Sequence, residues 1–348
     1  MRKGTNRSFW QRKTAARGEK GIEYLEKGMG KEMAAESHKN KIVVVGAGNV
    51  GEAIAYTLMV RQQANDIVLV DLNEDRAQGA AWDVAQGTSF YKQVWVRKGG
   101  YEECADAELI IITAGIARKP GQTRLELAKT NISIVKSITR SIMEYAKNPL
   151  ILVVSNPADL TTVAVWEESG LPRKRVIGSG TSLDTARFRY FISQELNVNI
   201  EDVHGYILGE HGDSQVPIWS TLTVGGIPVD AYAEEMNVTL DREAIAKSTR
   251  EGGAEIIKRK GATFYGVAMA VSTIVEALTT DQNAVLPVAH VLSKRFGDWA
   301  GIAFSLPCIV GCEGIEKTLH LPMTDEEIEA MNRSAKILRE FHDSVNNM

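Results

Sequence analysis

A single histidine stands between glycines at the end of an apolar run, in the segment LGEHGDS at residues 208–214. The imidazole group is the only side chain whose unperturbed charge change falls near neutral pH. A histidine at an exposed strand end is therefore suited to general acid/base chemistry. A lone histidine in a turn is more often structural. His211 needs partner residues before a catalytic role becomes the better interpretation.

Residues that could serve as partners occur in the segment SGTSLDTARFR at residues 179–189. On a helix, Asp184 and Arg187 are three positions apart and share a face. Arg187 can hold a carboxylate through two parallel hydrogen bonds, a geometry that lysine cannot match. Asp184 can accept a hydrogen bond from one imidazole nitrogen, fix the tautomer and favour the charged ring. The alternative is a plain helical ion pair between Asp184 and Arg187.

A basic loop with glycines near both ends, AGIARKPGQTR at residues 114–124, follows the apolar run at 109–113. In a parallel α/β sheet, ligands bind at the carboxyl ends of the strands. A loop that carries Arg118 and Arg124 at such a place is a candidate for a lid that closes over an anionic substrate. The alternative is a solvated basic loop.

The elements that must position these residues begin with a strand, a glycine turn and a helix. The three parts are residues 41–45 (KIVVV), residues 46–51 (GAGNVG) and residues 52–61. Gly46 allows the tight turn, Gly48 lets the backbone approach a pyrophosphate, and Gly51 lets helix and strand pack closely. Asp71 ends the next apolar run, where a carboxylate can bind a ribose 2′-hydroxyl. The pattern predicts an NAD site rather than an NADP site; the alternative is a glycine turn without a ligand.

Further apolar runs alternate with helical patterns along the first half of the chain. These runs, which we expect to be buried parallel strands, lie at residues 67–70, 94–96, 109–112 and 151–154. The alternation predicts an α/β fold, a doubly wound Rossmann sheet, followed by an α+β substrate domain. The predicted parts are an N-terminal extension at 1–40, an NAD-binding domain at 41–178 and a catalytic domain at 179–348. A helix at 325–343 is expected to cover the catalytic domain.

Composition limits the class of protein. A net charge of −4 over 348 residues argues against a nucleic-acid partner. No apolar run approaches the roughly 20 residues that span a bilayer, so no membrane partner is expected. The three cysteines, Cys104, Cys308 and Cys312, predict a reducing, cytoplasmic compartment with no disulfide framework. The spacing of Cys308 and Cys312 lacks an accompanying histidine or second cysteine pair, so no metal site is expected.

The first forty residues are rich in Lys, Arg, Gly and Glu and show no periodicity. Basic residues precede the first acid, Glu19, as in an organellar transit peptide, but later glutamates spoil that pattern. We expect a disordered tail, or a start codon assigned too early with the true start near Met29 or Met33. The N-terminal mass of the native protein distinguishes these alternatives.

In their chain order, these motifs resemble the lactate/malate dehydrogenases. The matching features are the glycine turn, Asp71, the loop ending at Arg124, SNP at 155–157, the helix with Asp184 and Arg187, and the His211 segment. The resemblance covers residues 41 to about 345. It implies an NAD-dependent enzyme that transfers hydride between the nicotinamide and C2 of a 2-hydroxy or 2-oxo acid.

The same resemblance implies a role for each candidate residue. His211 is the acid/base and Asp184 its orienting partner. Arg187 holds the substrate carboxylate, and Arg124 polarises the substrate carbonyl when the loop closes. The remaining contacts implied are Arg118, Asn156 and Thr263 to the substrate, and Gly46, Gly48, Asn49, Val50, Gly51, Asp71 and Asn156 to the cofactor.

Arg118 and several other positions disagree about the substrate. Arg118 stands where lactate enzymes usually carry glutamine and malate enzymes arginine, and its charge would pair with the second carboxylate of oxaloacetate. An unpaired charge in a closed pocket costs several kcal/mol. Other features instead resemble the lactate enzymes: Glu210, the region of Trp219, the segment SGT at 179–181 and the segment KGAT at 260–263. We expect lactate dehydrogenase activity. The alternatives are malate dehydrogenase, and a bulkier or mixed range of 2-oxo acids.

Arg189 and His204 match the residues that bind fructose 1,6-bisphosphate at a subunit interface in regulated bacterial lactate dehydrogenases. Arg189 lies two residues from Arg187, about 200° around a helix, so it must point away from the active site. The alternative is an ordinary surface pair. The resemblance also implies a homo-oligomer, a dimer or tetramer. A rival of another class is a non-catalytic NAD(H)-binding redox sensor, which needs only the first half of the chain.

Overall fold

The computed structural model describes residues 40–117 and 123–346. The expected N-terminal extension therefore falls outside the described residues, apart from its last position. Arg118 also lies outside them. In the part of the chain that the structure describes, no helix combines the length and apolar character needed to cross a bilayer.

Six parallel strands build the first half of the chain. They are β1 (Lys41–Val45), β2 (Asp66–Val70), β3 (Trp95–Lys98), β4 (Leu109–Ile112), β5 (Leu150–Val153) and β6 (Val176–Gly178). Their spatial order, β6-β5-β4-β1-β2-β3, reverses direction beside β1. This is the doubly wound order, in which a crevice forms at the carboxyl ends of β1 and β4. The prediction of a Rossmann sheet is confirmed.

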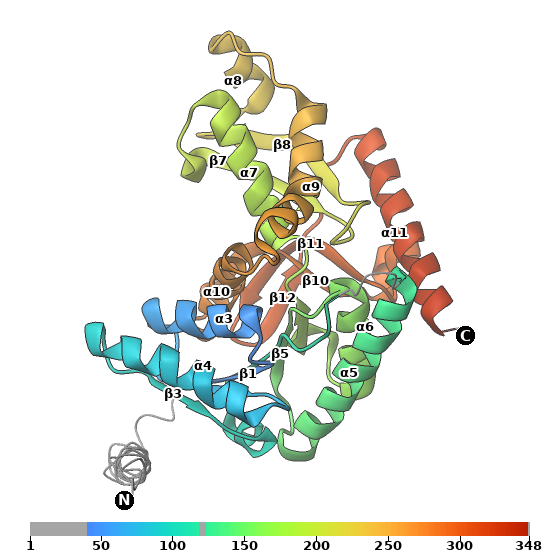
Figure 1. Cartoon of the computed structure of the whole chain (residues 1–348). Coiled ribbons are helices and arrows are strands. Elements are labelled where there is room, and N and C mark those ends of the chain that lie inside the picture. Colours follow the sequence, from blue (N-terminus) through green and yellow to red (C-terminus); the bar gives the residue numbers. More distant parts are fainter. Residues whose placement is uncertain (1–39, 118–122, 347–348) are drawn as a thin grey trace, which may run out of the picture. The chain divides into compact units, whose positions relative to one another are not determined.

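Helices cover both faces of this sheet (Figure 1). One face packs against α3 (Asn49–Val60), α4 (Glu74–Gly87) and α10 (Tyr265–Thr279), and the other against α5 (Arg124–Tyr145) and α6 (Ala158–Ser169). Successive side chains of a strand point to opposite faces. In β1, Ile42 and Val44 join one apolar cluster, and Val43 and Val45 join the other. Burial on both faces explains the unbroken aliphatic run.

Strand β3 differs from the expectation of a buried strand at 94–96. It begins one residue later, lies at the edge of the sheet and pairs only with β2. Only Val96 of the strand is buried, while Trp95 and Arg97 are half-buried and Lys98 is exposed. Within the expected run, Val94 and Val96 are buried and Trp95 between them is half-buried, so the run alternates as in a strand with one face packed on the core.

The second half adds a small three-stranded sheet and its helices. These elements are α7 (Ser182–Leu196), β7 (Val203–Leu208), β8 (Val216–Val224), β9 (Ile227–Pro228), α8 (Val229–Glu235) and α9 (Arg242–Lys260). Strands β10 (Ala284–Val291), β11 (Ala303–Gly311) and β12 (Gly314–Thr318) are antiparallel and extend the large sheet beyond β6. The expected α+β character of this half is confirmed. Short 3-10 helices occupy Thr88–Phe90, Tyr101–Asp106, Arg173–Arg175, Ile200–Asp202 and Lys294–Trp299.

Helix α11 (Asp325–Asn346) ends the described chain and contains the predicted helix at 325–343. It packs against β8 and the turn Lys294–Trp299 of the second half, and also against α5 of the first half. In Figure 1 it runs along the side of the molecule between the β8 region and α5. The helix therefore connects elements of both halves and is more than a cover of one.

Candidate active site

The glycine turn between β1 and α3 is closely packed at two of its three glycines. Gly46 has a φ of +109°, and a Cβ there would lie 2.7 Å from the backbone nitrogen of Ala114. A Cβ on Gly51 would lie 1.8 Å from the Gly46 carbonyl oxygen. At Gly48 the nearest atom to a Cβ would be 3.9 Å away. The backbone at Gly48 is thus open toward the crevice, which is where a pyrophosphate would need to approach.

Asp71 directly follows β2, beside this turn. Its carboxylate accepts the Ala47 N–H at 2.7 Å and the Asn73 N–H at 2.9 Å, so both oxygens are held in place. Of the other residues expected to contact the cofactor, Asn49 is exposed and Val50 is half-buried, packed against the core. The open backbone, the helix N-terminus at Asn49 and the fixed carboxylate together fit a dinucleotide with free ribose hydroxyls.

Arg76 of α4 contacts this turn and was not among the residues predicted from the sequence. Its Nε donates to the Ala47 carbonyl at 2.8 Å, and Nη2 lies 3.4 Å from Asn49 Oδ1. A cation is therefore fixed over the turn that faces the crevice. The signal was weak, because a basic residue in the first turns of a helix is common.

His211 and Asp184 form the centre of the site. His211 Nδ1 lies 2.5 Å from Asp184 Oδ2, although the two residues are 27 positions apart. Asp184 is buried in the first turn of α7, and its Oδ1 accepts a hydrogen bond from Arg187 Nη1 at 3.1 Å. The structure thus brings together the three residues that the sequence singled out, with Asp184 as the shared partner.

Electrostatics in this cluster favour a charged imidazole. The negative charge of Asp184 raises the pKa of His211 to about 9, against the opposing effect of burial. Burial alone would raise the pKa of Asp184, but the charges and hydrogen bonds of His211 and Arg187 outweigh it and lower that pKa. The pair therefore holds a proton on the imidazole at neutral pH, ready for transfer.

Asp159 is a second carboxylate at this histidine and was missed by the sequence reasoning. It lies in the first turn of α6, is 3% exposed, and its Oδ2 accepts the backbone N–H of His211 at 2.8 Å. Its Oδ1 has no hydrogen-bond partner among the described residues. Burial raises the pKa of Asp159 to about 7, partly offset by the charge of His211. The available signal was an acid two residues after the SNP motif.

A small cavity of about 40 Å³ lies beside His211. Its walls are largely apolar and are formed by Val154, Asn156, Ala158, Ser179, Gly180, Leu183, His211, Val267 and Ala270. Asn156 follows β5, and its carbonyl accepts a hydrogen bond from the buried Asn131 at 2.7 Å. The structure therefore places Asn156 and His211 on one cavity, as their expected shared role requires.

Two other expected substrate residues lie away from this cavity. Arg124 begins α5, and its Nη1 pairs with Asp213 Oδ2 at 2.7 Å. Thr263 is half-buried in the short segment between α9 and α10, just before the helix that supplies two of the cavity walls. Arg118 belongs to residues 118–122, which the structure does not describe.

Arg189 and Arg187 point to different neighbours, as their spacing on α7 predicts. Arg189 Nε donates to the Gly205 carbonyl of β7 at 3.1 Å, and its guanidinium lies 5.7 Å from the centre of the Tyr206 ring. Burial lowers the pKa of Arg189. It lines a second cavity, of about 300 Å³, between α7, α10 and β10. His204 is exposed on β7, next to the carbonyl that Arg189 contacts.

Comparisons with known proteins agree on one family over the described fold. Residues 40–178 match the model of the lactate/malate dehydrogenase NAD binding domain, and residues 181–348 match the lactate/malate dehydrogenase alpha/beta C-terminal domain. The chain is 43% identical to an L-lactate dehydrogenase of Acetivibrio thermocellus, over 86% of this chain and 96% of that protein. It is 41% identical to an L-lactate dehydrogenase of Kosmotoga olearia, over 88% and 96%.

Solved structures give the same picture. A lactate dehydrogenase from a deep-sea metagenome of the Medee basin superposes with a TM-score of 0.85 at 38% identity, covering 88% of this chain and 99% of that one. The minor L-lactate dehydrogenase of Enterococcus mundtii, in its ligand-bound form, gives a TM-score of 0.84 at 41% identity, with the same coverage.

Proposed function

Because the chain belongs to the lactate/malate dehydrogenase family, we propose that it is an NAD-dependent L-lactate dehydrogenase, which interconverts pyruvate and L-lactate. The observation that carries the acid/base chemistry is the 2.5 Å contact between His211 and the buried Asp184. The relatives named L-lactate dehydrogenase at 41–43% identity support the choice of substrate.

The chain's own residues carry the proton and hold the substrate. When bound at the glycine turn, the nicotinamide cofactor supplies or accepts the hydride. With Nδ1 occupied by Asp184, Nε2 is the nitrogen of His211 left to face the cavity, where it gives a proton to the substrate oxygen during reduction and removes it during oxidation. The buried Asp184 stabilises the imidazolium form that precedes the proton transfer.

Two arginines complete the proposed site. Arg187 holds the substrate carboxylate, because its guanidinium is fixed by Asp184 and provides a planar pair of donors. Arg124 leaves Asp213 and approaches the substrate oxygen when the loop closes, where it stabilises the negative charge that develops there. Asn156 donates its side-chain amide within the cavity, and Thr263, in the short segment before α10, contacts the substrate. Asp71 binds the adenine ribose.

Malate dehydrogenase is the second candidate function, and Arg118 is the observation that favours it. The two functions are separated by steady-state kinetics with NADH, in which we expect kcat/KM for pyruvate to exceed that for oxaloacetate. The opposite ranking, reversed by Arg118→Gln, would establish the malate enzyme. Tight NADH binding without oxidation by any small 2-oxo acid would instead support a redox sensor.

Regulation and assembly form a separate part of the proposal. We infer that Arg189 and His204 contribute to a site for fructose 1,6-bisphosphate in a cytoplasmic tetramer or dimer. Support comes from a half-buried arginine beside an exposed histidine on the adjoining strand. Sedimentation gives the number of subunits. A pyruvate saturation curve that fructose 1,6-bisphosphate leaves unchanged would remove the effector site.

A further inference from the structure

The segment that carries His211 is fastened on both sides to helix α11. The Glu210 N–H donates to Ser334 Oγ at 3.1 Å, and Ser334 Oγ lies 2.9 Å from Ser214 Oγ. Glu210 precedes the histidine directly and Ser214 follows it by three positions. Ser334 is fully buried, at 0% exposure. One side chain from the end of the chain thus contacts the backbone before His211 and the hydroxyl after it.

The directions of these hydrogen bonds close into a ring. Ser214 Oγ donates its only proton to the Glu210 carboxylate, which also accepts the Ser214 N–H at 3.2 Å. Ser214 can therefore only accept from Ser334, since a hydroxyl has one proton to give. Ser334 in turn accepts from the Glu210 N–H. Each hydroxyl of the ring acts as both donor and acceptor, so removing the Ser334 hydroxyl interrupts the ring at two places.

Helix α11 also approaches the segment closely enough to fix its path. Gly209 has a φ of +92°, and a Cβ there would meet Ser334 Oγ at 2.9 Å and Met331 Sδ at 3.5 Å. Seven residues before Ser334, on the same face of the helix, Glu327 accepts the backbone N–H groups of Trp219 and Ser220 at 2.8 and 3.0 Å. The helix therefore holds both the His211 segment and strand β8, which follows it.

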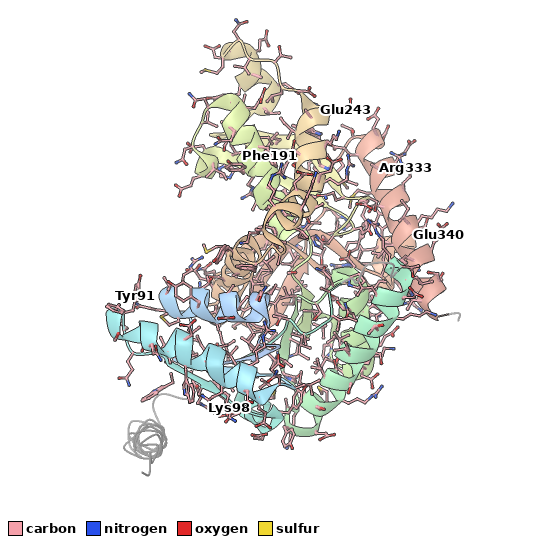
Figure 2. The ribbon with its side chains drawn as sticks, viewed as in Figure 1. Tyr91, Lys98, Phe191, Glu243, Arg333 and Glu340 are labelled. Carbon is pink, nitrogen blue, oxygen red and sulfur yellow. The ribbon has the colours of Figure 1, made fainter. Side chains whose placement is uncertain are left out.

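Other side chains of α11 are exposed. Arg333 and Glu340 point outward from the helix into solvent (Figure 2). Besides Ser334, the buried side chains of α11 in the described residues, Met331, Ala335, Leu338 and Val345, are apolar. A buried hydroxyl among apolar neighbours needs partners, and its partners here belong to the catalytic segment.

We propose that Ser334 is a positioning residue for His211: through the ring with Glu210 and Ser214, it holds the segment in the register that keeps the imidazole against Asp184. The inference rests on the proposed function, in which His211 carries the proton. Ser334 itself has no contact with the substrate cavity. It acts through hydrogen bonds to Glu210 and Ser214, which flank the histidine, so its loss should weaken the contact of His211 with Asp184 rather than remove a reacting group.

The consequence follows from the geometry of the His211–Asp184 contact. A hydrogen bond weakens steeply when its distance or angle departs from the optimum. A loosened segment lets His211 move away from Asp184, whose charge is the main reason that its pKa is raised. The pH range over which the histidine is protonated should then move down toward its ordinary value. Binding of NADH should change little, because the glycine turn lies on other elements.

The test uses the full-length wild-type protein, Ser334→Ala, and Leu338→Ala as a matched control on the same buried face. Leu338→Ala removes core packing of α11 without touching the ring. The measurements are kcat/KM for pyruvate against pH, NADH affinity, and the titration of His211 by NMR of histidine-labelled protein without ligands. For Ser334→Ala we expect a loss of about 10- to 100-fold in kcat/KM, the scale of a misplacement of about 1 Å, and a lower His211 midpoint. Leu338→Ala should lower only the melting temperature.

A second variant tests the inference even if Ser334→Ala does not fold. Ser214 is half-buried on the other side of the ring, so Ser214→Ala should shift the His211 midpoint in the same direction, and the double variant should add little. An unchanged midpoint and pH profile in both variants would overturn the inference, as would an equal shift in Leu338→Ala. Wild-type protein that reduces no 2-oxo acid would overturn the proposed function instead, while the NMR titration would still decide the role of Ser334.

Discussion

Arg124 is paired with Asp213, two residues beyond His211, with 2.7 Å between Nη1 and Oδ2. The two side chains are 70% and 69% exposed, and an ion pair in water contributes only about 0–1 kcal/mol. The backbone of Arg124 is fixed, because Thr123 and Glu126 form a capping box at the start of α5. The arginine can therefore exchange one carboxylate for a substrate oxygen by a side-chain movement that costs little.

Replacing Arg124 separates its chemical role from its resting contact. Arg124→Gln should lower kcat for pyruvate reduction on the order of 100-fold, the usual effect of losing one donor to a developing oxyanion. NADH affinity should stay within about twofold, because the glycine turn is untouched. Asp213→Asn is the matched variant: it removes only the resting contact, so kcat/KM should stay level or rise slightly. A loss as large as that of Arg124→Gln would show that Asp213 itself takes part in the reaction.

The charge of Asp184 sets the pH range of the reaction. The pKa of His211 is raised to about 9 by Asp184, so the protonated form needed for pyruvate reduction persists below that pH and is lost as pH rises through it. In Asp184→Asn the midpoint should fall toward the ordinary value near 6.5. Reduction at pH 7.5 should then drop by two or more orders of magnitude, on the scale of removing a triad aspartate. Steady-state rates against pH measure this.

Asp184→Asn should also change how the stability of the protein depends on pH. A histidine whose folded pKa is raised contributes stability that is complete below its unfolded value and is lost as pH rises through the folded one. Wild-type protein should therefore lose more stability than Asp184→Asn between about pH 7 and 9. Asp230→Asn, an exposed aspartate paired with Arg242 at the surface, serves as the control and should leave both the pH–rate profile and this slope unchanged.

The sequence predicts those parts of the site that are local patterns. The glycine turn and Asp71 lie within one βαβ unit, and their spacing alone indicates the cofactor site. Asp184 and His211 are 27 residues apart, and no periodicity joins them; the family resemblance did so. Asp159 and Ser334 were missed because each meets the segment at a backbone N–H, across 52 and 124 positions. Every residue except proline has a backbone N–H, so a hydrogen bond from this group cannot be predicted from the pattern of side chains.

The fold, like the site, was predictable from the sequence where it depends on local patterns. Strands β1, β2, β4 and β5 are buried on both faces and were visible as aliphatic runs. The extension of the large sheet by β10 could not be foreseen, because it joins β6 through a single registered pair, Ala289 with Gly178. A single registered pair depends on how the first and second halves of the chain pack together. The sequence pattern of either half alone does not predict that packing.

Two glycine-to-alanine changes should have opposite effects on stability. At Gly51 the new Cβ would lie 1.8 Å from the Gly46 carbonyl oxygen, so the turn must open, and both stability and NADH binding should fall strongly. At Gly79, in the exposed face of α4, nothing lies within 4 Å. Gly79→Ala should stabilise the protein by about 0.5–1 kcal/mol, because alanine loses less backbone freedom in a helix. Thermal unfolding and NADH titration of both variants test this, and equal behaviour would contradict the turn geometry.

Asp159 should make the protein less stable as the pH rises. Burial raises its pKa to about 7 from an ordinary value of 3.8, so its folded state prefers the proton. A carboxyl group with a raised folded pKa contributes stability below the unfolded value that is lost as pH rises through the folded one. The loss from this group should therefore fall mainly between about pH 4 and 7, below the range in which the contribution of His211 is lost.

Asp159→Asn tests this, because the amide oxygen can still accept the His211 N–H while carrying no charge. The variant should lack the loss of stability that Asp159 causes as the pH rises. Its free energy of unfolding, compared with that of wild type, should therefore be more favourable at pH 7.5 than at pH 4.5. Asp159→Ala, which also loses the acceptor, should be destabilised at both pH values and lose activity, since the His211 N–H is left without its partner. Urea unfolding at the two pH values measures these differences. Equal destabilisation of Asp159→Asn at both pH values would contradict this prediction. It would show that the Asp159 carboxylate is ionised in the folded protein and stabilises it through its charge.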